Sequence, residues 1–191
     1  MRKANIFGGG SRTNFNGLKF EGRTSFIKSK KKNKDFETRK IDIGYEIKFK
    51  NKKIGFYTEK NNFYKYLDYK NITWRNLISK KYEPDGMFLN YTNKTIYVIE
   101  KKYQETEGSV DEKLQTFHFK IWFYEKITKD LNINIDFAYL LSDWFFEKKY
   151  TQGWREGTLK YQEILDYLDL NNINVFRKEI PLDYLFPNMN L

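Results

Sequence analysis

Charged residues gather at the ends of two short apolar segments near the middle of the chain. The first segment, residues 86–91, directly follows Asp85, and the second, residues 95–102, ends with Glu100 and Lys102. Read as two strands joined by a short turn, they alternate so that Glu100 and Lys102 lie on the same face. Antiparallel pairing then brings Asp85 opposite them. We therefore expect two carboxylates and one ammonium group to converge at the end of a buried strand.

These three groups fit the metal-assisted hydrolysis of a phosphodiester. An isolated buried charge is costly, so the two carboxylates need a partner, and a divalent cation would satisfy both. Hard oxygen ligands of this kind suit Mg²⁺ or Mn²⁺. A cation held by Asp85 and Glu100 would lower the pKa of its bound water and neutralise the attacked phosphate. Lys102 would hydrogen-bond that water and the scissile phosphate. A surface ion-pair cluster with Lys101 and Lys102 is the structural alternative.

The composition excludes most other hydrolytic machinery. The 191 residues include no cysteine and one histidine, His118. Disulfide frameworks, thiolate zinc sites and cysteine nucleophiles are therefore absent, and catalytic triads and histidine-rich metal sites lack ligands or bases. The formal net charge of +10, from 35 basic and 25 acidic residues, favours a polyanionic partner, above all nucleic acid. Because the residue usage is typical of an AT-rich genome, which inflates lysine, a basic module that binds no nucleic acid is an alternative.

The expected elements describe one α/β domain with a central mixed sheet flanked by helices. Periodicity predicts a helix over about 14–29, a hairpin over 43–58, short helices within 60–80, a long helix from a cap at Ser109 to about 131, a strand over 137–141, a helix over 157–170 and a strand over 173–177. We expect a flexible leader at residues 1–13 and a single domain over residues 14–191.

The hydropathy pattern predicts neither a membrane span nor a signal peptide. No apolar run approaches the ~20 residues that a bilayer span requires. The opening residues MRKANIFGGGS lack the apolar core of a signal peptide. We expect a cytoplasmic protein with no membrane partner.

Pro84-Asp85, followed on the next strand by Glu100-Lys101-Lys102, resembles the PD-(D/E)xK nuclease superfamily, and residues 101–116 resemble small type II restriction endonucleases. The resemblance covers roughly residues 14–142. It implies a restriction endonuclease-like core, with the helix and strand over 157–180 completing the domain. It also implies that Glu21 faces the metal from a first helix and that the carbonyl of Lys101 joins the metal shell.

The activity that the resemblance implies is Mg²⁺-dependent cleavage of double-stranded DNA at a short specific sequence, with Mn²⁺ as a substitute cation. The implied partners are a second copy of the chain, in a homodimer, and a cognate DNA methyltransferase as a separate protein. A structure-specific or nicking DNA nuclease of the same fold and a non-catalytic DNA-binding protein are the alternatives. The same acid-x-Lys spacing recurs elsewhere, as at Glu46 and Lys48, but without a preceding Pro-Asp.

Other residues are candidates for DNA contact. Lys113 and Gln115, early in the long helix, could contact the phosphate near the cut. The lysine-rich run that contains Lys30, Lys31 and Lys32 could contact backbone phosphates by counterion release. Arg155, on a predicted loop, could read guanine edges in the major groove. Each of these side chains could also simply be solvent-exposed. We expect His118 to be packed or hydrogen-bonded, and the four tryptophans (Trp74, Trp122, Trp144 and Trp154) to lie in the core.

Overall fold

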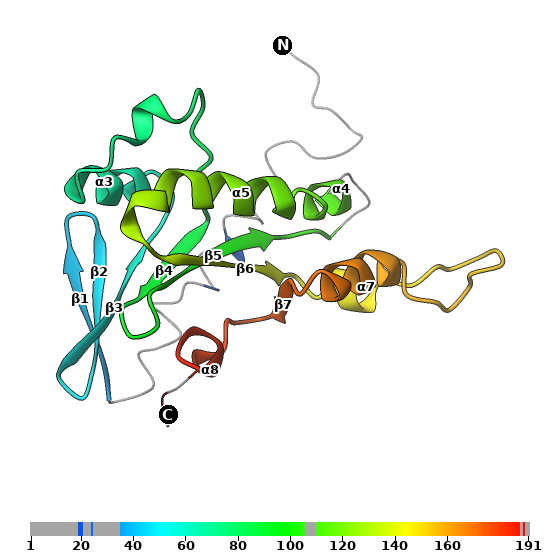
Figure 1. Ribbon diagram of the computed structural model, residues 1–191. Helices are drawn as coiled ribbons and strands as arrows, with labels where there is room; N and C mark the ends of the chain where they lie inside the picture. Colours follow the sequence, from blue (N-terminus) through cyan, green and yellow to red (C-terminus); the bar gives the residue numbers. More distant parts are fainter. Residues whose placement is uncertain (1–18, 21–23, 25–34, 106–109, 188, 190–191) are drawn as a thin grey trace, which may run out of the picture.

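A seven-stranded sheet, with its strands in chain order, forms the centre of the computed structural model (Figure 1). The structure describes residues 19–20, 24, 35–105, 110–187 and 189. The strands are β1 (Phe36–Ile41), β2 (Gly44–Phe49), β3 (Lys52–Thr58), β4 (Gly86–Asn90), β5 (Thr95–Lys102), β6 (Asn134–Leu141) and β7 (Asn174–Arg177). The helices are α3 (Asn62–Tyr69), α4 (Val110–Leu114), α5 (Phe117–Thr128), α6 (Trp144–Glu147), α7 (Gln162–Leu170) and α8 (Leu182–Leu185), with 3₁₀ turns η1 (Trp74–Asn76) and η2 (Lys129–Leu131).

The sheet changes from antiparallel to parallel at β5. Strands β1 to β5 pair antiparallel with their neighbours, and β5, β6 and β7 pair parallel. Parallel neighbours need a crossover, and α4 and α5 provide it between β5 and β6. The tight turn between β2 and β3 places Lys50 and Asn51 at positive φ, 47° and 63°, as a two-residue hairpin turn requires. The expected mixed α/β sheet is therefore confirmed.

Alternation along β5 separates two hydrophobic cores. Ile96 and Val98 face a core shared with α3, α5 and α7, whereas Tyr97 and Ile99 face a second core that includes Leu185 of α8. Figure 1 accordingly shows α3 and α5 on one side of the sheet and α8 on the other. Because β5 is covered on both faces, any charged side chain that it carries is shielded from water and needs a partner.

Most of the expected elements are present, with shifts at their ends. The long helix is divided into α4 and α5 at Gln115 and Thr116, whose N–H groups donate to carbonyls three residues back, those of Glu112 and Lys113, each at 3.3 Å, in place of the helical pattern. The helix expected from residue 157 begins at Gln162, because the preceding residues form a hairpin closed by a bridge between Lys149 and Leu159. Strand β1 and the short helices α6 and α8 were not anticipated.

The tryptophans do not all lie in the core, contrary to expectation. Trp74 is buried and Trp144 is half-buried, but Trp122 and Trp154 are 53% and 88% exposed. The leader at 1–13, most of the helix expected over 14–29 and the cap at Ser109 lie outside the described residues. In the part of the chain that is described, no helix combines the length and hydrophobicity that crossing a membrane requires.

Candidate active site

The β4–β5 register places Asp85 beside the end of β5. Gly86 is the partner of Ile99, and continuing the register by one residue puts Asp85 opposite Glu100. The Asp85 carboxylate accepts a hydrogen bond of 2.9 Å from the main-chain N–H of Lys101. Glu100 and Lys102 continue the face of Ile96 and Val98, beneath α5. The convergence expected from the two-residue period of a strand is therefore present.

One ammonium group holds the two carboxylates together. Lys102 Nζ lies 2.7 Å from Glu100 Oε2 and 3.5 Å from Asp85 Oδ2. The same nitrogen lies 3.3 Å from the main-chain oxygen of Lys101. The two carboxylates expected to hold a metal, and the Lys101 carbonyl that the resemblance adds to them, thus surround a single positive charge. The Glu100 side chain is only 5% exposed, so its charge depends on such partners.

A second lysine, Lys120 of α5, completes this group. Its Nζ lies 2.5 Å from Glu100 Oε2, the oxygen that also contacts Lys102. We refer to Asp85, Glu100, Lys102 and Lys120 as the charged cluster. Sequence reasoning missed Lys120, although the signal was present. It lies three residues after Phe117 and four before Tyr124, which are both buried, so a lysine occupies the inward face of the helix.

The two lysines respond to this environment in opposite directions. Burial lowers the pKa of the Lys102 amine, but the charges of Glu100 and Asp85 outweigh it and leave that pKa above its usual range. Burial also lowers the pKa of Lys120, and there the charge of Glu100, opposed by that of Lys102, does not compensate, so the pKa lies below its usual range. Lys102 is therefore the firmly charged member of the pair, and Lys120 releases its proton more readily.

The donor atoms fit a hard divalent cation. Among the described residues, no group of three or more His, Cys, Asp or Glu side chains is placed to hold a metal ion. The expected set needs only two carboxylates, with the carbonyl of Lys101 as the third oxygen. Those three oxygens already lie around one cation, the Lys102 ammonium. Carboxylate and carbonyl oxygens are the ligands that Mg²⁺ takes in proteins, with water in the remaining positions.

Of the remaining predicted residues, those that the structure describes are not brought into the cluster. Lys113 and Gln115 are exposed on and just after α4. Arg155 pairs with Glu163 of α7, its Nη1 2.5 Å from Glu163 Oε1. Glu21, Lys30, Lys31 and Lys32 lie outside the described residues. His118 Nε2 lies 3.3 Å from the hydroxyl of Tyr167, in keeping with the hydrogen-bonded side chain expected for it.

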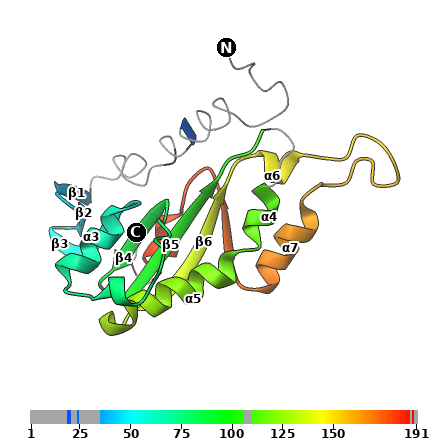
Figure 2. The same cartoon turned by 90° about the horizontal axis from the view of Figure 1, so that it is seen from above.

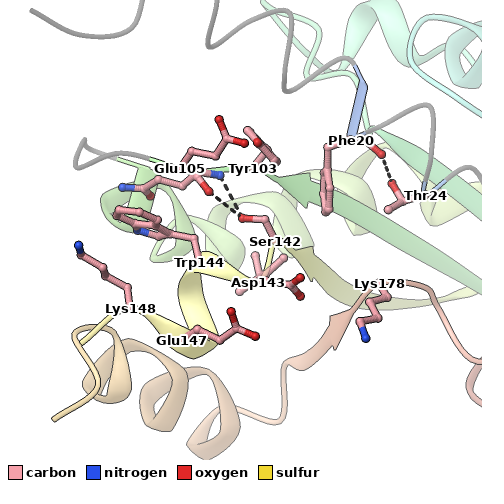
Figure 3. Close-up of a pocket in the computed structure, with 12 residues that line it drawn as sticks. Phe20, Thr24, Tyr103, Glu105, Ser142, Asp143, Trp144, Glu147, Lys148 and Lys178 are labelled. Carbon is pink, nitrogen blue, oxygen red and sulfur yellow. Dashed lines mark hydrogen bonds between the residues drawn. The ribbon is translucent and has the colours of Figure 1, made fainter. Parts of the chain in front are cut away.

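A hollow of about 600 Å³ opens just beyond the carboxyl ends of β5 and β6 (Figure 3). Ser142, which lines the hollow, is bonded to β5, the strand that carries Glu100 and Lys102: its N–H donates to the carbonyl of Lys102 at 3.0 Å. The Ser142 hydroxyl in turn accepts from the N–H of Gln104 and donates to its carbonyl, each at 3.1 Å. Figure 3 shows Asp143 and Glu147 on the α6 side of the hollow. The hollow is lined by polar side chains such as Asp143 and Glu147 and by apolar ones such as Phe20 and Trp144, and the side chains of the charged cluster are not among its lining residues.

This chain matches no protein-family model, no curated protein and no solved structure. Its function is therefore inferred from its residues and their arrangement.

Proposed function

We propose that this protein is a Mg²⁺-dependent endonuclease that hydrolyses the phosphodiester bonds of duplex DNA, with a core of the PD-(D/E)xK, restriction endonuclease-like type. The observation that carries the proposal is the convergence of Asp85, Glu100 and the Lys101 carbonyl on the ammonium group of Lys102, at the end of a buried strand. A protein gains little stability from burying two carboxylates and two lysines together. Such a group is expected where chemistry requires it.

The order of the elements supports the same proposal. Asp85 directly precedes β4, Glu100 and Lys102 end β5, helices α4 and α5 follow, and β6 then pairs parallel with β5. The resemblance of the sequence to small type II restriction endonucleases implies this order of strand, strand, helix and strand. We further propose cleavage at a short specific sequence by a homodimer, with a separate DNA methyltransferase as its companion.

The chemistry assigns a role to each member of the cluster. Asp85, Glu100 and the Lys101 carbonyl would hold Mg²⁺, which supplies a Lewis acid that activates water and neutralises charge on the attacked phosphate. A cation on the carboxylates would compete with both ammonium groups, and Lys102 would then donate to the attacking water and the scissile phosphate. Lys120, which contacts Glu100 in the absence of a cation, would then be a donor to a neighbouring phosphate oxygen. In-line attack would leave 5′-phosphate and 3′-hydroxyl ends.

The test is incubation of the purified protein with a long duplex DNA, in Mg²⁺ or in EDTA, followed by sequencing of the DNA ends. We expect discrete Mg²⁺-dependent fragments whose ends share one short motif. Asp85→Asn and Lys102→Ala should abolish cleavage while DNA binding, measured in EDTA, is kept. Lys48→Ala is the matched control, because Glu46 and Lys48 have the same spacing on β2, where Glu46 pairs with Lys53.

Other outcomes would change the assignment. Full cleavage by Asp85→Asn or Lys102→Ala would exclude the cluster as the site. Nicks or a smear would favour a structure-specific or nicking nuclease of the same fold. Absence of cleavage with binding retained would favour a non-catalytic DNA-binding protein.

A further inference from the structure

Residues 149–159 form a hairpin that projects from the body of the protein, and we call it the tip hairpin. Lys149 and Leu159 pair at its base. Along it, the N–H of Tyr150 donates to the carbonyl of Thr158 and the N–H of Gly157 donates to that of Tyr150, at 3.1 and 3.0 Å. Gly153 and Gly157 take positive φ, +84° and +81°, which a tight turn requires. Figures 1 and 2 both show this segment reaching away from α6 and α7.

The tip hairpin presents one large aromatic ring to solvent. Trp154 is 88% exposed. The guanidinium carbon of Arg155 lies 4.4 Å from the centre of the indole ring, which is the geometry of a cation–π contact. Arg155 is itself held by Glu163 of α7. The guanidinium beside the indole is therefore itself paired with a side chain of α7. A tryptophan ring that is exposed beside a guanidinium offers a stacking surface to a partner.

The charges of the segment indicate that the partner is a polyanion. Residues 148–160 include four basic side chains (Lys148, Lys149, Arg155 and Lys160) and one acidic side chain, Glu156. Two of the lysines lie over aromatic rings. Lys148 Nζ is 4.8 Å from the ring centre of Trp144, and Lys160 Nζ is 5.7 Å from that of Tyr150. Cations beside aromatic rings combine attraction to phosphate with stacking on bases.

The place of the tip hairpin connects it to the charged cluster. Strands β5 and β6 are parallel, so their carboxyl ends lie at the same edge of the sheet. The cluster lies at the end of β5, and the chain leaves the end of β6 through α6 directly into the tip hairpin. Figure 2 shows β5 and β6 ending beside α6, from which the tip hairpin extends. A DNA duplex bound over the cluster therefore has the tip hairpin at its side.

We propose that Trp154 is a wedge that stacks into a weakened base step of the duplex, with Arg155 as a positioning residue held by Glu163. The identity of the polyanion as DNA rests on the proposed function. Apolar side chains inserted between base steps unstack and kink a duplex, which wraps it more closely around the protein. Arg155 is thereby reassigned, because its guanidinium is engaged by Glu163 and Trp154 and supports the ring in place of reading guanine edges.

The test measures binding without chemistry, by fluorescence anisotropy in EDTA. The probes are two short labelled duplexes of the same sequence, one perfect and one with a central mismatch that weakens stacking. The parent protein should prefer the mismatched duplex by about tenfold, a value within the range for a base stacked on an aromatic side chain. Trp154→Ala should remove this preference, and Trp154→Phe should keep part of it. Arg155→Lys should reduce the preference while leaving the salt dependence of binding unchanged.

Leu170→Ala is the control, because Leu170 at the end of α7 is 81% exposed and also apolar. It should bind both duplexes as the parent does. An unchanged mismatch preference in Trp154→Ala would overturn the wedge, even if the parent cuts DNA. A preference that depends on Trp154 would support the wedge even if no DNA is cut, in which case the proposed hydrolysis alone fails. Loss of binding to phosphatidylglycerol vesicles in Trp154→Ala, with DNA binding unchanged, would assign the ring to a membrane surface.

Discussion

Replacing Glu100 with glutamine removes the charge on which two lysines converge and keeps the size of the side chain. Lys102 and Lys120 both contact Glu100 Oε2, at 2.7 and 2.5 Å. In the parent protein, two carboxylates balance two ammonium groups, so the charged cluster is neutral. In Glu100→Gln, Asp85 alone faces both lysines, and the cluster carries one uncompensated positive charge. We therefore expect the substitution to destabilise the fold.

The magnitude follows from the burial of the partners. Removing one member of a buried ion pair costs about 3–5 kcal/mol. The side chains of Lys102 and Lys120 are 16% and 17% exposed, and Lys102 keeps Asp85 at 3.5 Å, which favours the lower end of that range. We expect a loss of about 3 kcal/mol. For a chain of this length, that loss corresponds to a decrease in Tm of about 6–12 °C.

A double-mutant cycle isolates the interaction. Glu100→Gln with Lys120→Met leaves Asp85 and Lys102 as a neutral pair, so the loss in the double variant should be about 1–2 kcal/mol smaller than the sum of the two single losses, a coupling typical of contacting charges. The measurements are thermal and urea unfolding in EDTA at neutral pH, followed by circular dichroism. Glu37→Gln on β1 is the control, because its side chain is exposed and surface substitutions change stability by less than about 0.5 kcal/mol.

Two results would refute this account of the charged cluster. Glu100→Gln could be as stable as the parent or more stable, as happens when a site carries carboxylates that repel one another until a ligand binds. The double variant could also show purely additive losses. Either result would mean that the lysines do not neutralise the carboxylates in solution.

Two further predictions concern pH and packing. Lys102 has a raised pKa in the folded state, so its contribution to stability is complete below its ordinary value of 10.5 and is lost as pH rises through the folded-state value. The measurement uses Lys120→Met, because the pKa of Lys120 is shifted in the opposite direction. The free energy of unfolding of Lys120→Met should fall above pH 10.5, and it should fall more steeply than in the double variant with Lys120→Met and Lys102→Met. Gly55→Ala should cost about 1–3 kcal/mol in urea unfolding, because the added Cβ would lie 2.7 Å from the carbonyl oxygen of Leu89. A loss below about 0.5 kcal/mol, the range of surface substitutions, would contradict the close approach of β3 to β4.

The strand pair at the site could be predicted because its determinants are local. A strand has a side-chain period of two residues, and the turn between β4 and β5 is short. These two facts alone place Asp85 opposite Glu100 and put Glu100 and Lys102 on one face. The same reasoning located the β2–β3 hairpin and strands β6 and β7. The single domain over 14–191 and the roles of Glu21 and Lys30–Lys32 stay predictions.

The departures arise where a local pattern meets competing interactions. Periodicity predicted one long helix, but the backbone turns at Gln115 and Thr116, whose N–H groups donate to carbonyls three residues back, and two helices result. The tryptophans were expected in the core from their average behaviour, yet Trp154 lies in a hairpin turn that places it at the surface, with Arg155 beside its ring. Side-chain preferences averaged over many proteins cannot predict such an arrangement, because it depends on one particular set of neighbours.

The sequence by itself determined the acidic pair, the lysine beside it and the mixed sheet, since all three follow from strand period, turn length and hydrophobic pattern. Only the tertiary structure decided that Lys120 would reach Glu100 from α5, which makes the charged cluster neutral. It also decided that Trp154 would stand at an exposed tip beyond the end of β6. The physical reason is that helix phase, the crossover between parallel strands and the packing of α5 on the sheet together place residues far apart in the chain, and no short-range pattern encodes that combination.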